Sequence, residues 1–141
     1  MNFQYNDGGR KDAGYKGEAS DCVVRAIAIA TEKPYQEVYD AVNEIGKSEH
    51  NGKNKKGKSS ARNGVFKYTI KKYLTSLGWK WTPTMFVGQG CKTHLKASEL
   101  PAGRIIVDVS KHMTVVINGV VHDTHDPSRN ETRCVYGYWT K

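Results

Sequence analysis

The chain has few cysteines, and their number and spacing exclude several architectures. Only three of its 141 residues are cysteines, at positions 22, 91 and 134, and no two form a Cys-x-x-Cys pair. An odd number with this spacing predicts neither a disulfide framework nor a typical structural zinc site. Thiols of this kind normally occur in a reducing cytosol, so we expect a cytoplasmic location.

Long apolar segments are also missing. No run approaches the roughly 18 residues that span a bilayer, and the first ten residues, Met-Asn-Phe-Gln-Tyr-Asn-Asp-Gly-Gly-Arg, do not resemble a signal peptide. We therefore expect a soluble chain without membrane contact. The length fits one compact domain over residues 1–141, long enough to bury a real core.

Acidic residues are scarce in one segment. Between Gly46 and Tyr73 the chain carries nine basic residues and one acidic residue, so much of the net charge of +8 belongs there. The Lys, Gly, Asn and Ser composition predicts a flexible basic loop at about 47–63. Its lysines are candidates for contacts with nucleic acid or an acidic protein, and a solvated loop that only aids solubility is the alternative. These lysines are Lys53, Lys55, Lys56 and Lys58.

Helical patterns fill the first half of the chain after a glycine-rich lead-in, residues 1–20, that we expect to be irregular. Apolar residues recur at helical spacing over 21–31, 35–45 and about 64–77. Lys33-Pro34 is expected to end the first helix and Gly46 the second.

The last third has the pattern of strands. A short strand is expected within 79–85, one helical turn within 93–100, and further strands at 104–109, 113–117, 120–123 and 133–139. Asn118-Gly119 between two β-branched runs is a strong hairpin signal. Helices followed by an antiparallel sheet predict an α+β fold.

Cys22 lies at the start of the first predicted helix, where Ser20 or Asp21 is expected to cap the backbone N–H groups. The partial positive charge of a helix N-terminus lowers the pKa of a thiol and favours the nucleophilic thiolate. Cys22 is therefore a candidate nucleophile. The alternative is that it is a small buried apolar residue like its neighbours.

The predicted hairpin gives a register for the residues that follow. With a two-residue Asn-Gly turn, Thr114 lies opposite Asp123 and His112 opposite His125, all on one face. Asp123 is then diagonal to His112, where a carboxylate can orient the imidazole and stabilise its protonated form.

Two alternatives involve the residues after the hairpin. Asp126 competes with Asp123 as the partner of His112, because a turn at Asp126-Pro127 would bring Asp126 to the same face. His122, Asp123, His125 and Asp126 also have the side chains of a metal site, but alternate residues of a strand face opposite sides. We therefore expect no metal and no cofactor.

The order of these residues resembles the papain-like cysteine peptidases, and in particular their small bacterial and phage-encoded members. The resemblance is carried by Asp21-Cys22-Val23-Val24-Arg25-Ala26, by Leu100-Pro101-Ala102-Gly103-Arg104-Ile105-Ile106-Val107, by Lys111-His112-Met113-Thr114-Val115-Val116 and by Gly119-Val120-Val121-His122-Asp123-Thr124. It implies a papain-like fold with N-terminal helices packed on the sheet. It also implies that Cys22 is the nucleophile, His112 the general base and then acid, and Asp123 the orienting residue.

The resemblance further implies hydrolysis of an amide or isopeptide bond in a protein or peptide substrate through a thioacyl intermediate. A phage-encoded enzyme of this kind would act in the host cytoplasm. The family usually places a glutamine several residues before the nucleophile, whereas Lys16 and Gly17 occupy that neighbourhood here. Gln4, or else Asn6, is then the candidate oxyanion residue, together with the backbone N–H of Cys22.

The alternative function is a non-catalytic binding module on the same scaffold. It would engage nucleic acid or an acidic protein through the lysine-rich segment.

Overall fold

The computed structural model describes residues 1–17, 19–47 and 59–141. This part of the chain contains three α-helices and a short 3₁₀ helix, in the order predicted from the periodicity. They are α1 (Cys22–Thr31), α2 (Tyr35–Lys47), α3 (Lys67–Ser76) and the 3₁₀ helix η1 (Ala97–Glu99). None of the helices in these ranges is both long and apolar enough to cross a membrane.

Six strands form one mixed sheet in the order β1-β5-β4-β3-β6-β2. The strands are β1 (Asn2–Tyr5), β2 (Lys80–Pro83), β3 (Arg104–Val109), β4 (His112–Ile117), β5 (Val120–Asp123) and β6 (Val135–Thr140). Neighbouring strands run antiparallel, except that β1 is parallel to β5. The prediction of an α+β fold is confirmed, and the prediction of a purely antiparallel sheet is wrong at one edge.

The parallel edge strand lies in the lead-in that we expected to be irregular. Asn2 pairs with Val120 and Tyr5 with Asp123, so β1 occupies the free edge of β5. All four side chains of β1 are exposed. An alternation of buried and exposed residues is the usual sequence signal of a strand, and its absence explains why β1 was not predicted.

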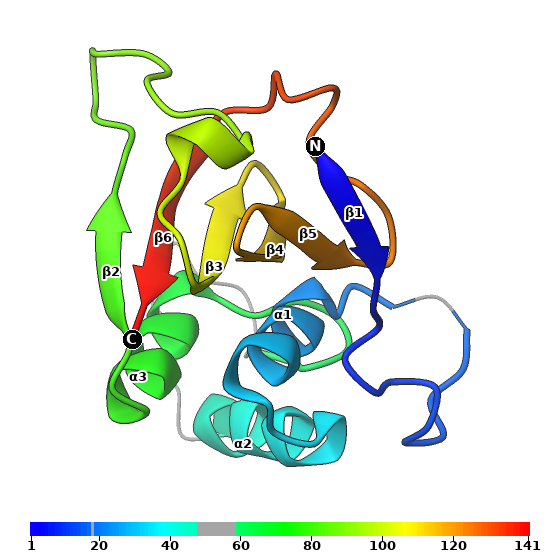
Figure 1. The fold of residues 1–141 in the computed structure, drawn as a ribbon. Coiled ribbons are helices and arrows are strands. Elements are labelled where there is room, and N and C mark those ends of the chain that lie inside the picture. The colour runs from blue at the N-terminus through cyan, green and yellow to red at the C-terminus, as the bar shows by residue number, and fades with distance from the viewer. Residues whose placement is uncertain (18, 48–58) are drawn as a thin grey trace.

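The two faces of the sheet are covered differently (Figure 1). The helices lie together on one face, with α1 between the sheet and α2. Seven of the ten residues of α1 are buried there. On the opposite face a second apolar cluster is built on valines of the central strands and is completed by Leu95 and Leu100 from the connection between β2 and β3.

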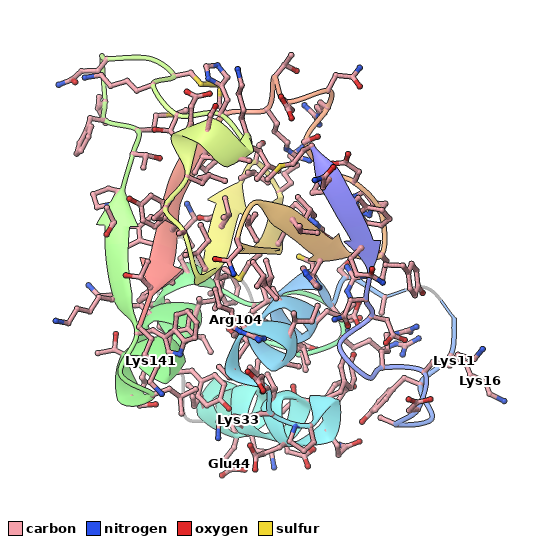
Figure 2. The ribbon with its side chains drawn as sticks, viewed as in Figure 1. Lys11, Lys16, Lys33, Glu44, Arg104 and Lys141 are labelled. Carbon is pink, nitrogen blue, oxygen red and sulfur yellow. A yellow bond between two sulfur atoms is a disulfide. The ribbon has the colours of Figure 1, made fainter. Side chains whose placement is uncertain are left out.

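Arg104, the first residue of β3, fixes the C-terminal end of α1 to the sheet (Figure 2). Its guanidinium donates a hydrogen bond of 2.8 Å to the carbonyl of Ile29 and forms an ion pair of 3.0 Å with Glu32. Glu32 caps the helix in the left-handed conformation, with a φ of 59°. Because Lys33-Pro34 follows, the helix ends where the sequence predicted.

The hairpin between β4 and β5 has the predicted register. Ile117 pairs with Val120, and Asn118 and Gly119 have φ values of 47° and 82°. Positive φ at both central residues is the requirement of a type I′ turn, which asparagine and glycine meet with little strain. The hairpin therefore places His112 and Asp123 as expected.

The segment before α3 corrects three predictions. α2 does not end at Gly46 but continues to Lys47. Residues 59–63 are not a loose loop, because Ser59 and Ala61 are buried and Ser60 pairs with Gly64. This pairing turns the chain back on itself, so α3 begins at Lys67 rather than Gly64.

The remainder of the predicted basic loop, including Lys53, Lys55, Lys56 and Lys58, lies outside the described residues.

Gly46 leads to a stability prediction. A Cβ atom at this position would lie 2.5 Å from the backbone carbonyl oxygen of Ser59. Gly46→Ala should therefore lower the free energy of unfolding by about 1–3 kcal/mol in urea denaturation. In an ordinary helix interior the same change would stabilise by roughly 0.5–1 kcal/mol, so a stabilised variant would contradict the contact. Glu44→Ala, an exposed change on the same helix, is the control.

Candidate active site

Cys22 is the first residue of α1 and is half-buried. Of the two predicted caps, Ser20 and Asp21, Asp21 is wrong, because it makes no capping hydrogen bond to the helix. Its buried carboxylate instead accepts the hydroxyl of Tyr35 at 2.6 Å and forms ion pairs with Arg10 at 3.1 Å and Arg25 at 3.4 Å. Two guanidinium groups stabilise a buried carboxylate more strongly than a single backbone N–H does.

This arrangement has a consequence for the helix N-terminus. Since Asp21 is occupied elsewhere, its side chain leaves the first-turn N–H groups of α1 uncapped beside Cys22. Uncapped N–H groups at a helix N-terminus carry partial positive charge and can donate to an anion. They are suited to stabilise both a thiolate and the oxyanion of a tetrahedral intermediate.

His112 and Asp123 form a nearly enclosed pair at the ends of two adjacent strands. Nε2 of His112 lies 2.7 Å from a carboxylate oxygen of Asp123, and their side chains are 11% and 6% exposed. The other oxygen of Asp123 accepts the backbone N–H of Thr124 at 2.7 Å. Asp126 accepts the backbone N–H of Ser128 instead. Of the two carboxylates considered, Asp123 is therefore the partner of His112.

Cys22 is the second group that acts on the ring of His112, and each of the two shifts the pKa of the other. Because Nε2 is taken by Asp123, Nδ1 is the nitrogen that remains for the thiol. Burial lowers the pKa of His112, but its hydrogen bonds to Asp123 and Cys22 outweigh burial and raise the pKa to about 9. At neutral pH these contacts favour the imidazolium.

The pKa of the thiol is shifted in the complementary direction. Burial raises the pKa of Cys22, yet the hydrogen bond and charge of His112, a backbone hydrogen bond from Met113 and the charge of Arg25 together lower it below the ordinary value. Burial also raises the pKa of Asp123, and its contact with His112 lowers that pKa on balance. The three groups therefore favour a thiolate, an imidazolium and a carboxylate.

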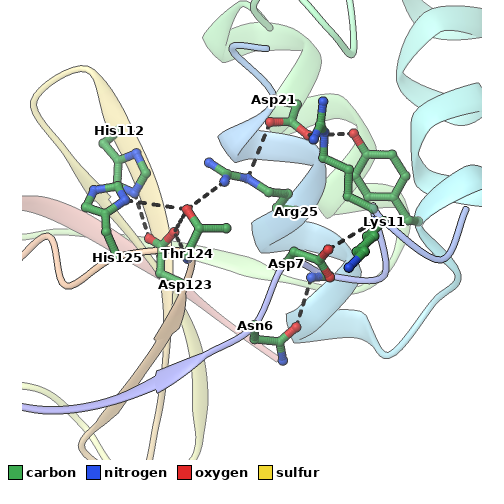
Figure 3. A network of polar contacts seen from close by, with 12 residues as sticks. Asn6, Asp7, Lys11, Asp21, Arg25, His112, Asp123, Thr124 and His125 are labelled. Carbon is green, nitrogen blue, oxygen red and sulfur yellow. Dashed lines mark hydrogen bonds and ion pairs between the residues drawn. The ribbon is translucent and has the colours of Figure 1, made fainter. Parts of the chain in front are cut away.

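A chain of polar contacts joins this triad to the buried Asp21 (Figure 3). Arg25, one helical turn after Asp21, donates a hydrogen bond of 2.8 Å to the hydroxyl of Thr124. Thr124 is bonded in turn to Asp123. Arg25 and Thr124 lie in the stretches 21–26 and 119–124 that carry the resemblance, but their pairing was not predicted, because a contact across 99 positions has no local signal.

His125 lies against His112, as the hairpin register predicted. The two ring centroids are 5.1 Å apart and the rings are tilted by 48°. His122 occupies the other side of the strand, where it lines a hollow with Ala28 and Ile29 of α1. Within the described residues, the four candidates His122, Asp123, His125 and Asp126 do not converge as a metal-binding group.

The two candidate oxyanion residues lie in and just after β1. Gln4 is exposed, pairs along the backbone with His122 and donates its amide to the carbonyl of Tyr5. The side chain of Asn6 accepts the backbone N–H of Gly8. In the described part of the chain the hydrogen bonds of these two amides go to groups other than Cys22, whereas the helix N-terminus adjoins the thiol directly.

Cys91 and Cys134 form a disulfide, although the number and spacing of the cysteines predicted no disulfide framework. They lie 43 positions apart with a Cα–Cα distance of 5.8 Å. A spacing of this kind is uninformative in sequence, because only the folded chain places the loop after β2 beside the start of β6. Cys22 is the free cysteine.

Two hollows are each lined by a residue next in sequence to His112 or Asp123. One, of about 860 Å³, is lined by Met113 and by apolar side chains that include Trp81, Phe86 and Val87. The other, of about 720 Å³, is more polar, and Asp21, Arg25 and Thr124 form part of its wall. Each hollow is therefore lined by the residue that follows a member of the triad in sequence, Met113 after His112 and Thr124 after Asp123.

Comparison of the chain with protein-family models, with curated proteins and with solved structures finds no match.

The shifted pKa of Cys22 predicts a measurable reactivity. The rate of Cys22 alkylation by iodoacetamide should reach half its maximum at a lower pH than for glutathione, because His112 stabilises the thiolate. His112→Ala should move that midpoint upward by removing both the hydrogen bond and the charge. The rate would be followed by mass spectrometry of the peptide containing Cys22, and an unchanged midpoint in the variant would contradict the pairing.

Proposed function

We propose that the chain is a papain-like cysteine hydrolase that cleaves an amide or isopeptide bond in a protein or peptide. The observation that supports this most directly is the position of His112, which is hydrogen-bonded to Asp123 and lowers the pKa of Cys22 at a helix N-terminus. A thiolate, a base able to hold its proton, and a carboxylate that orients the base are the requirements of thiol-based acyl transfer.

In the proposed reaction the Cys22 thiolate attacks the carbonyl carbon of the scissile bond, and a C–S bond forms. The carbonyl oxygen gains negative charge and is stabilised by the N–H of Cys22 and the uncapped first turn of α1. Protonated His112 then gives its proton to the departing nitrogen, and the C–N bond breaks. A thioester between substrate and Cys22 remains.

Water completes the cycle. His112, now neutral, removes a proton from a water molecule, which attacks the thioester carbonyl and releases a carboxylic acid. The sulfur leaves as the thiolate and the imidazolium is restored. Asp123 keeps the ring in one orientation throughout. Thr124, which is hydrogen-bonded to Asp123, is in turn bonded to Arg25 and so links Asp123 to α1.

The larger hollow is the candidate substrate pocket in this proposal. We place an apolar side chain of the substrate in the larger hollow, because its wall exposes Trp81, Phe86 and Val87 and continues to Met113 beside the catalytic base. Exposed apolar side chains that line a hollow next to reactive groups are typical of substrate pockets. The oxyanion role given to Gln4 is not part of this proposal.

A cytoplasmic location, in the host if the chain is phage-encoded, belongs to this proposal. The alternative of a binding module rests on Lys53, Lys55, Lys56 and Lys58, which lie outside the described residues. No contact within the described ranges favours it over hydrolysis.

Hydrolysis can be tested with a mixture of fluorogenic peptide amides that vary at the residues before the scissile bond. The parent chain should release fluorophore and Cys22→Ser should not. His112→Ala should lower kcat by about 10²–10⁴-fold, the usual contribution of a general acid–base group. A peptide fluoromethyl ketone should add its mass to Cys22 in the parent chain and fail to do so in His112→Ala.

The control is Cys91→Ser combined with Cys134→Ser, which keeps the triad and should keep activity and labelling at Cys22. If neither the peptide mixture nor the ketone reacts with the parent chain, while the circular dichroism of the chain shows it folded, the proposal is wrong.

The substrate pocket gives a separate prediction. Phe86→Ala removes exposed apolar surface from the wall and should raise KM about tenfold, equivalent to about 1.4 kcal/mol, with kcat little changed. The measurement uses the best peptide from the mixture. Glu44→Ala, on the exposed face of α2, should leave both constants unchanged. A fall in kcat alone would place Phe86 outside the substrate pocket.

A further inference from the structure

Three side chains with metal-binding atoms converge away from the triad. The sulfurs of Cys91 and Cys134 and a ring nitrogen of His94 lie within 4.8 Å of one another. Sulfur and imidazole nitrogen are the ligands that zinc prefers, and two thiolates would neutralise the charge of one Zn²⁺.

The backbone holds two of these residues together. His94 and Cys134 pair as an antiparallel bridge, flanked by hydrogen bonds of 2.8 Å from Leu95 to Arg133 and from Val135 to Thr93. Leu95, the residue after His94, is fully buried in the second apolar cluster. The position of His94 beside Cys134 is therefore fixed by packing and does not depend on the bond between the two sulfurs.

The orientation of His94 is the observation that points to a metal. Its Nδ1 lies 3.3 Å from a carboxylate oxygen of Glu99, and its Nε2 lies 3.6 Å from Sγ of Cys91. When Nδ1 carries the proton and donates it to Glu99, the lone pair of Nε2 is directed at the sulfurs. Metal-binding histidines are commonly oriented by a carboxylate in this way, and a disulfide alone needs neither group.

We propose that Cys91, His94 and Cys134 form a zinc site when the two cysteines are reduced. In the structure the two sulfurs are joined as a disulfide. A dithiol reductant supplies two electrons and two protons, which converts the disulfide to two thiols. Zn²⁺ then displaces those two protons and binds two thiolates and the neutral imidazole, with water as the fourth ligand.

The zinc site would link two parts of the chain that are far apart in sequence. It ties the connection after β2, which contributes Phe86, Val87 and Gly90 to the apolar hollow, to the start of β6. Arg133, the neighbour of Cys134, also donates a hydrogen bond to the carbonyl of Ser110, two residues before His112. The zinc site does not require the proposed hydrolase activity, since none of its ligands belongs to the triad.

The test uses the full chain, reduced with a phosphine, treated with a chelator and then freed of both. Co²⁺ is added as a spectroscopic substitute and displaced with Zn²⁺. We expect one ion per chain, with a thiolate-to-cobalt charge-transfer band and the visible bands of tetrahedral cobalt. Cys22→Ser should retain this spectrum, because its thiol lies outside the cluster.

Two variants separate the proposal from loss of folding. Cys134→Ser should lose the charge-transfer intensity, and Glu99→Gln, which keeps all three ligands, should weaken zinc binding by about 10–100-fold. Cobalt that binds the parent chain without thiolate bands, or zinc that binds Cys91→Ser as tightly as the parent, would show that the two cysteines form a disulfide only. Circular dichroism of each variant confirms that it is folded before it is compared.

Discussion

The hydrogen bond between Arg25 and Thr124 connects the two halves of the candidate site. Arg25 lies on α1 with Cys22, and Thr124 follows β5 directly after Asp123. Without this contact and the apolar packing of α1 on the sheet, the thiol and the imidazole would belong to elements free to move apart. Arg25 is itself held by Asp21, whose buried carboxylate also binds Arg10 and Tyr35. The geometry of the candidate site therefore depends on a buried ionic cluster outside Cys22, His112 and Asp123.

Burial acts against the charged form of every member of the triad. It raises the pKa of Cys22 and Asp123 and lowers that of His112, and hydrogen bonds between the members reverse each of these effects. Because each charged group is stabilised by its neighbour, the charged form of one group depends on the charges of the other two. The same low polarity that penalises an isolated charge strengthens the contacts among them.

Local sequence signals predicted the elements that carry the site but not what surrounds them. The Asn118-Gly119 turn and its β-branched flanks fixed a register that placed Asp123 diagonally across from His112. Asp21 was expected to cap α1 because aspartate does so in isolated helices, yet in the folded chain two arginines and a tyrosine compete for it more strongly. Gly46 was read as a helix stop, whereas its lack of a side chain allows Ser59 to approach.

The sequence by itself determined the helices and the hairpin whose register places Asp123 near His112, since these depend on short-range periodicity and turn chemistry. Only the tertiary structure decided the parallel edge strand, the contact of Arg25 with Thr124 and the meeting of Cys91, His94 and Cys134. Each of these joins residues far apart in the chain. Such contacts form because packing of the whole sheet and helix layer brings them together, and no local preference of the residues involved encodes them.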